Sequence, residues 1–204
     1  MVKVKVCGIT NAGDGVAAVE SGADALGLVF ARSPRRVGVG EAREVAEAVP
    51  EGVLKVGVFV NEGPDEVLRV VEAVGLDYAQ LHGDEGPEAV TELRDRGVKV
   101  IKALRVRDAG SLAALEGFDA DLFLLDAYSE KARGGTGEKF DWGLAKSLEG
   151  RDNILVSGGL GPENVGEAIR LFRPYGVDAS SSLESAPGKK DRERVRRFIF
   201  AARN

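Results

Sequence analysis

Two side chains that could transfer protons stand at the ends of apolar, strand-like stretches. Cys7, the only cysteine, follows the alternating valines and lysines of 2–6, and Asp126 ends the apolar run 122–125. A lone cysteine is more often an inert buried thiol, and an isolated aspartate is equally a helix N-cap, a structural partner or an acid/base group. Two such groups facing one substrate from different sides would suit an isomerisation, because one donates a proton while the other removes one.

Two further segments carry groups that suit a phosphate. Ser157 is followed by Gly158 and Gly159, and a later apolar stretch ends in Ser180 and Ser181. Backbone N–H groups at glycine turns bind dianions well, and serine hydroxyls add donors. A flexible glycine loop and a surface run of serines are the plainer interpretation. We nevertheless expect a phosphorylated small molecule as the ligand, because of where these segments fall in the fold predicted below.

Other polar residues also follow strand-like stretches. Arg35 or its neighbour Arg36 could pair with a substrate carboxylate through a guanidinium fork, although most such arginines are solvated. His82, the only histidine, follows Gln80 and would orient a ligand or transfer protons. Lys102 could form a Schiff base as in barrel aldolases, but most lysines in such places are ion-paired or solvated.

The elements that must position these groups alternate strictly along the chain. The predicted strands lie at 2–6, 24–30, 54–60, 77–81, 98–104, 121–126, 153–157 and 177–180, and the predicted helices at 11–21, 41–49, 64–74, 87–96, 108–116, 141–148, 162–172 and 190–202, with a loop at 127–139. Such alternation indicates a parallel sheet with helical crossovers. Eight units of about 25 residues fit a closed (β/α)₈ TIM barrel better than an open doubly wound sheet. We expect one domain, 1–204.

Four similar Gly-X-Asp triplets support this count of units. They lie at 22–24, 75–77, 117–119 and 176–178, each where a helix should end and a strand begin. Glycine there is expected to supply a left-handed helix cap. In a TIM barrel the active site lies at the C-terminal ends of the strands, often with phosphate bound after strands seven and eight. Cys7, Asp126, Ser157 and Ser180 all fall at such strand ends.

Composition excludes several functional classes. The 204 residues carry 28 Lys and Arg against 33 Asp and Glu, a net charge of -5, which argues against binding nucleic acid or an anionic membrane. No apolar run approaches the ~20 residues of a membrane span, and Met1 leads directly into a strand without a signal peptide. One cysteine fits a cytoplasmic protein and, with one histidine, leaves no thiolate or imidazole metal cluster. Scarce Gln, Met and Cys lean towards a thermophilic source, for which a homodimer is plausible.

A series of motifs resembles the phosphoribosylanthranilate isomerase family of tryptophan biosynthesis. These motifs are KVCGIT at 5–10, SGADALGLVF at 21–30, SPR at 33–35, VGVFVN at 56–61, QLHG at 80–83, LLDA at 124–127, GGTG at 134–137, SGGLGPENV at 157–165 and DASS at 178–181. Single motifs are weak, but the full series covers essentially the whole chain in order. One departure is Ser182, where the family usually has glycine.

The resemblance implies an Amadori rearrangement of N-(5-phosphoribosyl)anthranilate without metal or organic cofactor. Cys7 would be the general base, with a lowered pKa, and Asp126 the general acid, with a raised pKa. Arg35 would hold the anthranilate carboxylate, with Arg36 as the alternative. The remaining site residues that the resemblance implies are Gln80, His82 and Asp178 for the substrate and Gly158, Gly159, Ser180 and Ser181 for the phosphate. The loop at 134–137 would close over the substrate.

Three alternatives remain open on the sequence alone. The histidine-pathway sugar isomerase performs the same rearrangement on a related barrel, but it resembles a two-aspartate design, which Cys7 argues against. A Schiff-base aldolase would use Lys102. A catalytically silent phosphosugar-binding barrel would keep the phosphate-binding groups but would not need Cys7 and Asp126.

Overall fold

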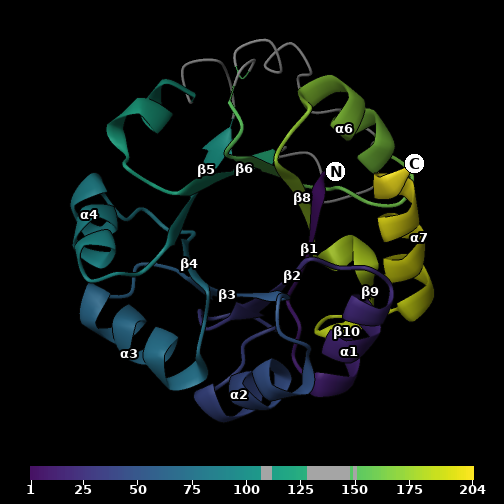
Figure 1. Cartoon of the computed structure of the whole chain (residues 1–204), viewed down its shortest axis with the longest axis horizontal. Helices are drawn as coiled ribbons and strands as arrows, with labels where there is room; N and C mark the ends of the chain where they lie inside the picture. The colour runs from purple at the N-terminus through teal and green to yellow at the C-terminus, as the bar shows by residue number, and fades with distance from the viewer. Residues whose placement is uncertain (107–111, 128–147, 149–150) are drawn as a thin grey trace.

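Eight parallel strands form a closed barrel in chain order, and helices surround it (Figure 1). The computed structural model describes residues 1–106, 112–127, 148 and 151–204. The barrel strands are β1 (Lys3–Cys7), β2 (Ala25–Val29), β3 (Leu54–Phe59), β4 (Tyr78–Leu81), β5 (Val100–Val106), β6 (Leu122–Ala127), β7 (Ile154–Ser157) and β8 (Gly176–Ala179). The predicted (β/α)₈ barrel is therefore confirmed, and each of the eight strands overlaps its predicted segment to within two residues.

The helices on the outside overlap the predicted helical segments. They are α1 (Ala12–Glu20), α2 (Val39–Ala48), α3 (Pro64–Val74), α4 (Pro87–Asp95), α6 (Val165–Phe172) and α7 (Arg192–Arg203), with short 3₁₀ turns η1 (Ala114–Gly117) and η3 (Ser181–Leu183). Their starts have local causes: Asn11 caps α1 by accepting from the Asp14 N–H, and Asp191 caps α7 in the same manner. Proline begins α3 and α4, where its missing N–H costs nothing.

Several boundaries differ from the predictions. Helix α6 begins at Val165 rather than 162, because Asn164 accepts the Gly161 N–H and shapes the residues before it as turns. An antiparallel hairpin of β9 (Glu184–Ala186) and β10 (Lys189–Lys190) precedes α7, and it was not predicted. The predicted loop at 127–139 and helix at 141–148 lie almost wholly outside the described residues. Residues 112–116 are the described part of the helix predicted at 108–116, and they lead into the 3₁₀ turn η1.

The glycine triplets act in two different ways. Gly22 and Gly75 have φ of 104° and 73°, which confirms the predicted left-handed conformation at these helix ends. The prediction is wrong for Gly117 and Gly176, neither of which has a positive φ. Gly176 is required for another reason, since a Cβ there would lie 2.8 Å from the Lys3 carbonyl oxygen of the neighbouring strand. The glycine thus lets β8 approach β1 closely.

Alternating side chains divide the core into two layers. Outward-facing strand residues, such as Val4, Leu26 and Phe123, pack against the helices in the main cluster. Inward-facing residues, such as Val56 and Leu124, fill the barrel in a separate cluster. This division follows from the two-residue period of a strand, and it decides which polar side chains can reach the barrel mouth.

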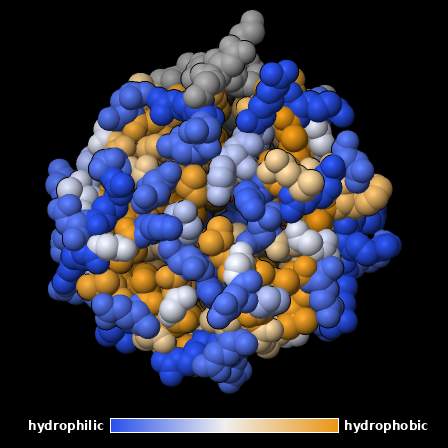
Figure 2. Space-filling view, viewed as in Figure 1, coloured by the Kyte–Doolittle hydropathy of each residue, from blue (hydrophilic) through white to orange (hydrophobic). Residues whose placement is uncertain are grey.

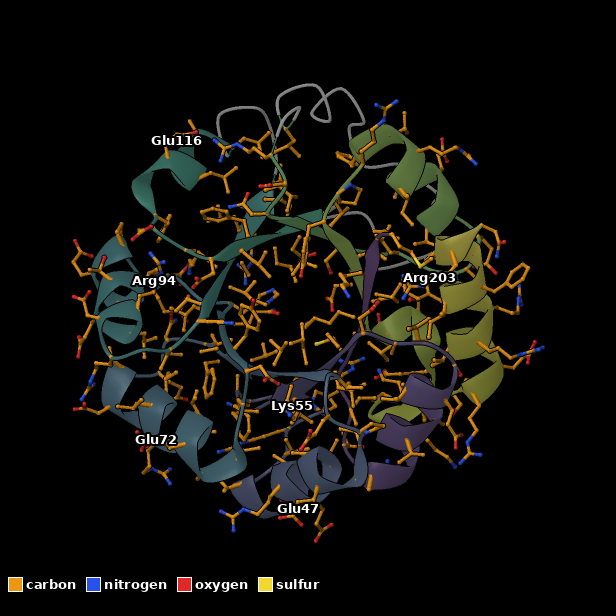
Figure 3. The ribbon with its side chains drawn as sticks, viewed as in Figure 1. Glu47, Lys55, Glu72, Arg94, Glu116 and Arg203 are labelled. Atoms are coloured by element: carbon orange, nitrogen blue, oxygen red, sulfur yellow. The ribbon has the colours of Figure 1, made fainter. Side chains whose placement is uncertain are left out.

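The barrel is closed by pairing its first strand with its last. Lys5 and Val6 of β1 stand in register with Asp178 and Ala179 of β8. Arg203, at the end of α7, donates to the Val2 carbonyl and binds Asp24 Oδ2 at 2.6 Å, so the two ends of the chain lie together (Figures 1 and 3).

Charged side chains dominate the outer surface. Glu47 and Glu72 project from the outer helices, and hydrophilic residues line the periphery of the molecule (Figures 2 and 3). Among the residues that the structure describes, no helix is both long enough and apolar enough to cross a bilayer.

Candidate active site

A cavity of about 370 Å³ opens at the C-terminal ends of the strands. Its walls contain ten residues for which a site role was predicted: Cys7, Arg35, Gln80, His82, Asp126, Gly158, Gly159, Asp178, Ser180 and Ser181. Arg36 is exposed and does not line the cavity. The barrel therefore gathers residues from nearly the whole length of the chain into one site.

Cys7 forms part of the cavity floor at the end of β1. Its side chain is 8% exposed and packs with Val29, Ala31 and Val58 in a small apolar cluster. On the adjacent strand, Gly27 stands in register with Cys7. A Cβ at Gly27 would lie 2.6 Å from Cys7 Sγ, so the glycine leaves the space that the thiol occupies.

The electrostatics of Cys7 differ from the prediction. Burial raises the pKa of the thiol, and this effect exceeds the lowering caused by the nearby Lys5 ammonium and by Lys190. The predicted lowering of the Cys7 pKa is therefore wrong, because a thiolate loses its hydration in this apolar cluster. The sequence revealed the position of Cys7 at a strand end but not the apolar residues that other strands bring around it.

Asp126, at the end of β6, faces His82. The distance from His82 Nε2 to Asp126 Oδ2 is 3.6 Å. Gln80 lies 2.7 Å from the other ring nitrogen, His82 Nδ1, and so fixes the orientation of the ring. If the Gln80 amide donates to Nδ1, the ring carries its proton on Nε2, towards Asp126. Gln80, His82 and Asp126 thus form one polar wall.

Arg35 is already ion-paired. Its Nε and Nη2 donate to the two carboxylate oxygens of Glu184, both at 2.7 Å. Glu184 is 6% exposed and also accepts from Lys190 Nζ at 2.9 Å. Sequence reasoning missed Glu184 and Lys190. The Pro-Gly pair at 187–188 between them was the available signal for the hairpin that carries them.

The predicted phosphate segments lie side by side. Gly158 and Gly159 have φ of 91° and 67°, so this turn requires glycine. Ser182 donates from Oγ to the Leu160 carbonyl and links the loop after β7 to the loop after β8. Ser182 is not among the residues with positive φ, so serine in place of the family's usual glycine causes no backbone strain here.

Two further charged residues of the barrel have different surroundings. Lys102 is 2% exposed, faces the helix layer, and binds Glu85 Oε2 at 2.6 Å and the Gly83 carbonyl at 3.0 Å. It does not line the cavity, which removes the Schiff-base alternative. Asp178 binds Lys5 Nζ at 2.7 Å and accepts from Ser157 Oγ at 3.1 Å.

Comparison with known proteins gives consistent matches over the full length. Residues 4–201 match the family model described as N-(5'phosphoribosyl)anthranilate (PRA) isomerase. A protein of that name from Rubrobacter xylanophilus is 66% identical over 206 residues, covering all of both chains. The crystal structure of phosphoribosyl anthranilate isomerase from Thermotoga maritima superposes with a TM-score of 0.91 at 43% identity, covering 100% of this chain and 99% of that one. A structure of such an isomerase in complex with reduced 1-(o-carboxyphenylamino)-1-deoxyribulose 5-phosphate gives 0.89 at 41% identity, with the same coverage.

Proposed function

Because this chain belongs to the N-(5'-phosphoribosyl)anthranilate isomerase family, we propose that Cys7 and Asp126 carry out the family's rearrangement in the cavity described above. The chain is an isomerase of tryptophan biosynthesis. The observation that carries the assignment of roles is that a thiol and a carboxylate line the same cavity from non-adjacent strands, β1 and β6. This arrangement suits an acid and a base that act on different atoms of one substrate.

Asp126 and Cys7 carry out the first two proton transfers of the reaction. Asp126 donates a proton to the ribose ring oxygen, the bond from that oxygen to C1′ breaks, and the anthranilate nitrogen forms a Schiff base with C1′. The Cys7 thiolate then removes the proton from C2′, which gives an enolamine. The enolamine takes up a proton at C1′ and loses the proton of its C2′ hydroxyl group, which gives the aminoketone. His82 faces Asp126, with 3.6 Å between His82 Nε2 and Asp126 Oδ2.

Binding groups surround the two proton-transfer residues. Arg35 receives the anthranilate carboxylate, and its bidentate contact with Glu184 holds the guanidinium in place before the substrate arrives. Gly158, Gly159, Ser180 and Ser181 bind the phosphate with backbone and hydroxyl donors. Gln80 and Asp178 complete the substrate contacts from the remaining wall.

The test is turnover of phosphoribosylanthranilate by variants, followed as loss of substrate fluorescence. Cys7→Ala and Asp126→Asn should each lose about 10²–10⁴-fold or more in kcat, while product binding persists. Turnover that survived both substitutions would contradict the mechanism, and loss of binding together with turnover would point to misfolding. Arg35→Ala should mainly raise KM, and an unchanged KM would move the carboxylate contact to Arg36.

We also propose that residues 1–204 form one domain that acts in the cytoplasm as a homodimer. A related solved structure, 40% identical to this chain, is described as monomers generated from the dimeric enzyme of Thermotoga maritima. Sedimentation equilibrium of this chain checks the proposal, and a mass of 21.6 kDa, that of a single chain, would contradict the dimer.

A further inference from the structure

Lys5 is a buried cation directly beneath the candidate active site. It precedes Cys7 by two residues on β1, so both side chains point into the barrel. The Lys5 side chain is 2% exposed, and its Nζ binds Asp178 Oδ1 at 2.7 Å. Lys5 does not line the cavity, whereas Cys7 and Asp178 do. Lys5 therefore influences the reaction by its charge rather than by direct contact with a molecule in the cavity.

A contribution to the stability of the fold does not by itself explain why this ion pair is present. Removing two charges from water costs about as much as their attraction returns, and apolar residues of similar volume often replace buried pairs without loss. The fold offers a direct comparison in Lys102, also 2% exposed and paired with Glu85 at 2.6 Å. Lys102 faces the helices and binds Gly83 and Glu85 in the loop after β4, while Lys5 faces the thiol. The two lysines share their burial and pairing but differ in what they face.

The charges around the Cys7 thiol do not balance. Lys5 interacts with it from β1, Lys190 from β10 and Arg35 from the loop after β2. The carboxylates packed among these cations are Asp178, on Lys5, and Glu184, on both Arg35 and Lys190. Among the described residues, three cations against two carboxylates leave one positive charge, which a Cys7 thiolate would neutralise.

Of the residues that the structure describes, the other titratable groups that line the cavity are Arg32, Asp126 and His82. Asp126 and His82 line the same cavity from β6 and the end of β4, and they face each other. Neither is among the charges that act most strongly on the thiol, and Lys5 is the strongest of those that favour its charged form.

We propose that Lys5 is a positioning residue of the isomerase reaction, whose buried ammonium group favours the thiolate form of Cys7, the form that removes the substrate proton. The inference rests on the proposed role of Cys7 as the base. The thiol releases its proton to solvent before the substrate binds, and the thiolate later receives the C2′ proton. Lys5 keeps its own proton throughout, and Asp178 holds the ammonium against β8.

The consequence is a pH dependence that a purely structural lysine would not cause. Burial already raises the pKa of Cys7, and Lys5 limits the rise. Without the ammonium, thiolate formation must move to higher pH, and both alkylation of the thiol and turnover must follow it. Below that pKa, the thiolate fraction falls tenfold for each unit of pKa increase.

The experiment compares Lys5→Met with Lys102→Met. Cys7 is the only cysteine, so the rate of alkylation by iodoacetamide reports on this thiol alone. In Lys5→Met we expect the midpoint of the pH–rate profile to rise by at least one unit, kcat at pH 7 to fall at least tenfold, and kcat to recover as the pH is raised. In Lys102→Met the midpoint and the pH profile of kcat should match the unmodified protein, even if thermal stability falls.

An unchanged alkylation midpoint in folded Lys5→Met overturns the proposal. If Lys5→Met does not fold, Lys5→Met with Asp178→Asn removes both charges, and its midpoint must still lie above that of the unmodified protein, because Lys5 acts on the thiol more strongly than Asp178 does. Failure of the proposed function would look different. Cys7→Ala would then keep its turnover, while in proteins that retain Cys7 the alkylation midpoint would still depend on Lys5.

Discussion

Gly27 offers a way to displace the thiol of Cys7 without changing the thiol itself. Gly27 lies on β2 in register with Cys7, and both face the barrel interior. Replacing it with alanine adds one methyl group, with no change in charge or hydrogen bonding. The Cβ of that alanine would lie 2.6 Å from Cys7 Sγ and 3.0 Å from Cys7 Cα.

The size of the effect follows from these contacts. Ordinary van der Waals contact begins near 3.4 Å, so Sγ must move by about 0.8 Å or rotate to another rotamer. Overpacking of this kind costs about 1–3 kcal/mol of stability, and each kcal/mol lowers Tm by about 2–4 °C in a chain of this length. A displacement near 1 Å costs about 10²-fold in rate. We therefore expect Gly27→Ala to lose far more activity than stability.

The assay measures kcat by loss of substrate fluorescence and Tm by circular dichroism. Gly40→Ala is the matched control, since it makes the same change at an exposed position of α2 with no atom within 4 Å of the added Cβ. The control should keep its activity and have an equal or slightly higher Tm, because alanine favours the helix.

Two outcomes would refute the reasoning about Gly27. A folded Gly27→Ala protein with kcat within twofold of the unmodified protein would show that the place of Sγ is unimportant. A loss of activity matched by global unfolding at the assay temperature would show that the glycine serves the fold rather than the thiol.

Three further predictions concern other parts of the molecule. Burial would raise the pKa of Glu85, but the hydrogen bond from Lys102 and backbone donors lower it below the usual value. The contribution of the Glu85 carboxylate to stability is therefore lost as pH falls below about 4. Tm measured from pH 7 to pH 3 should fall less steeply in Glu85→Gln than in the unmodified protein. Arg203→Ala removes the contacts to Asp24 and to the Val2 carbonyl, and it should lower the free energy of unfolding in urea by about 1–3 kcal/mol. An unchanged free energy of unfolding would mean that these contacts do not stabilise the chain ends. Inorganic phosphate should raise Tm in proportion to the logarithm of its concentration, and Ser180→Ala should reduce that rise; an equal rise in both would place the anion elsewhere.

The sequence was sufficient for the barrel because its periodic signals are local. Alternating strands, helix stops and the count of eight units are all readable within short windows, and the strand ends then identified Cys7 and Asp126. Contacts made by barrel closure could not be predicted in this way. The pairing of Lys5 with Asp178 joins residues 173 positions apart, and nothing near either residue indicates the other. The pKa of Cys7 was likewise misjudged, because Val29 and Val58 reach it from other strands.

The pairing of β1 with β8 has a consequence for folding during synthesis. During synthesis Lys5 leaves the ribosome 173 residues before Asp178, so throughout that interval the ammonium has no partner. A buried, unpaired ammonium is costly, so we expect β1 to stay hydrated and the nascent sheet to stay open until Asp178 is available. We therefore expect barrel closure and completion of the charge network to occur in one late step. A chain truncated before residue 178 would leave Lys5 without its partner and remain open to proteases.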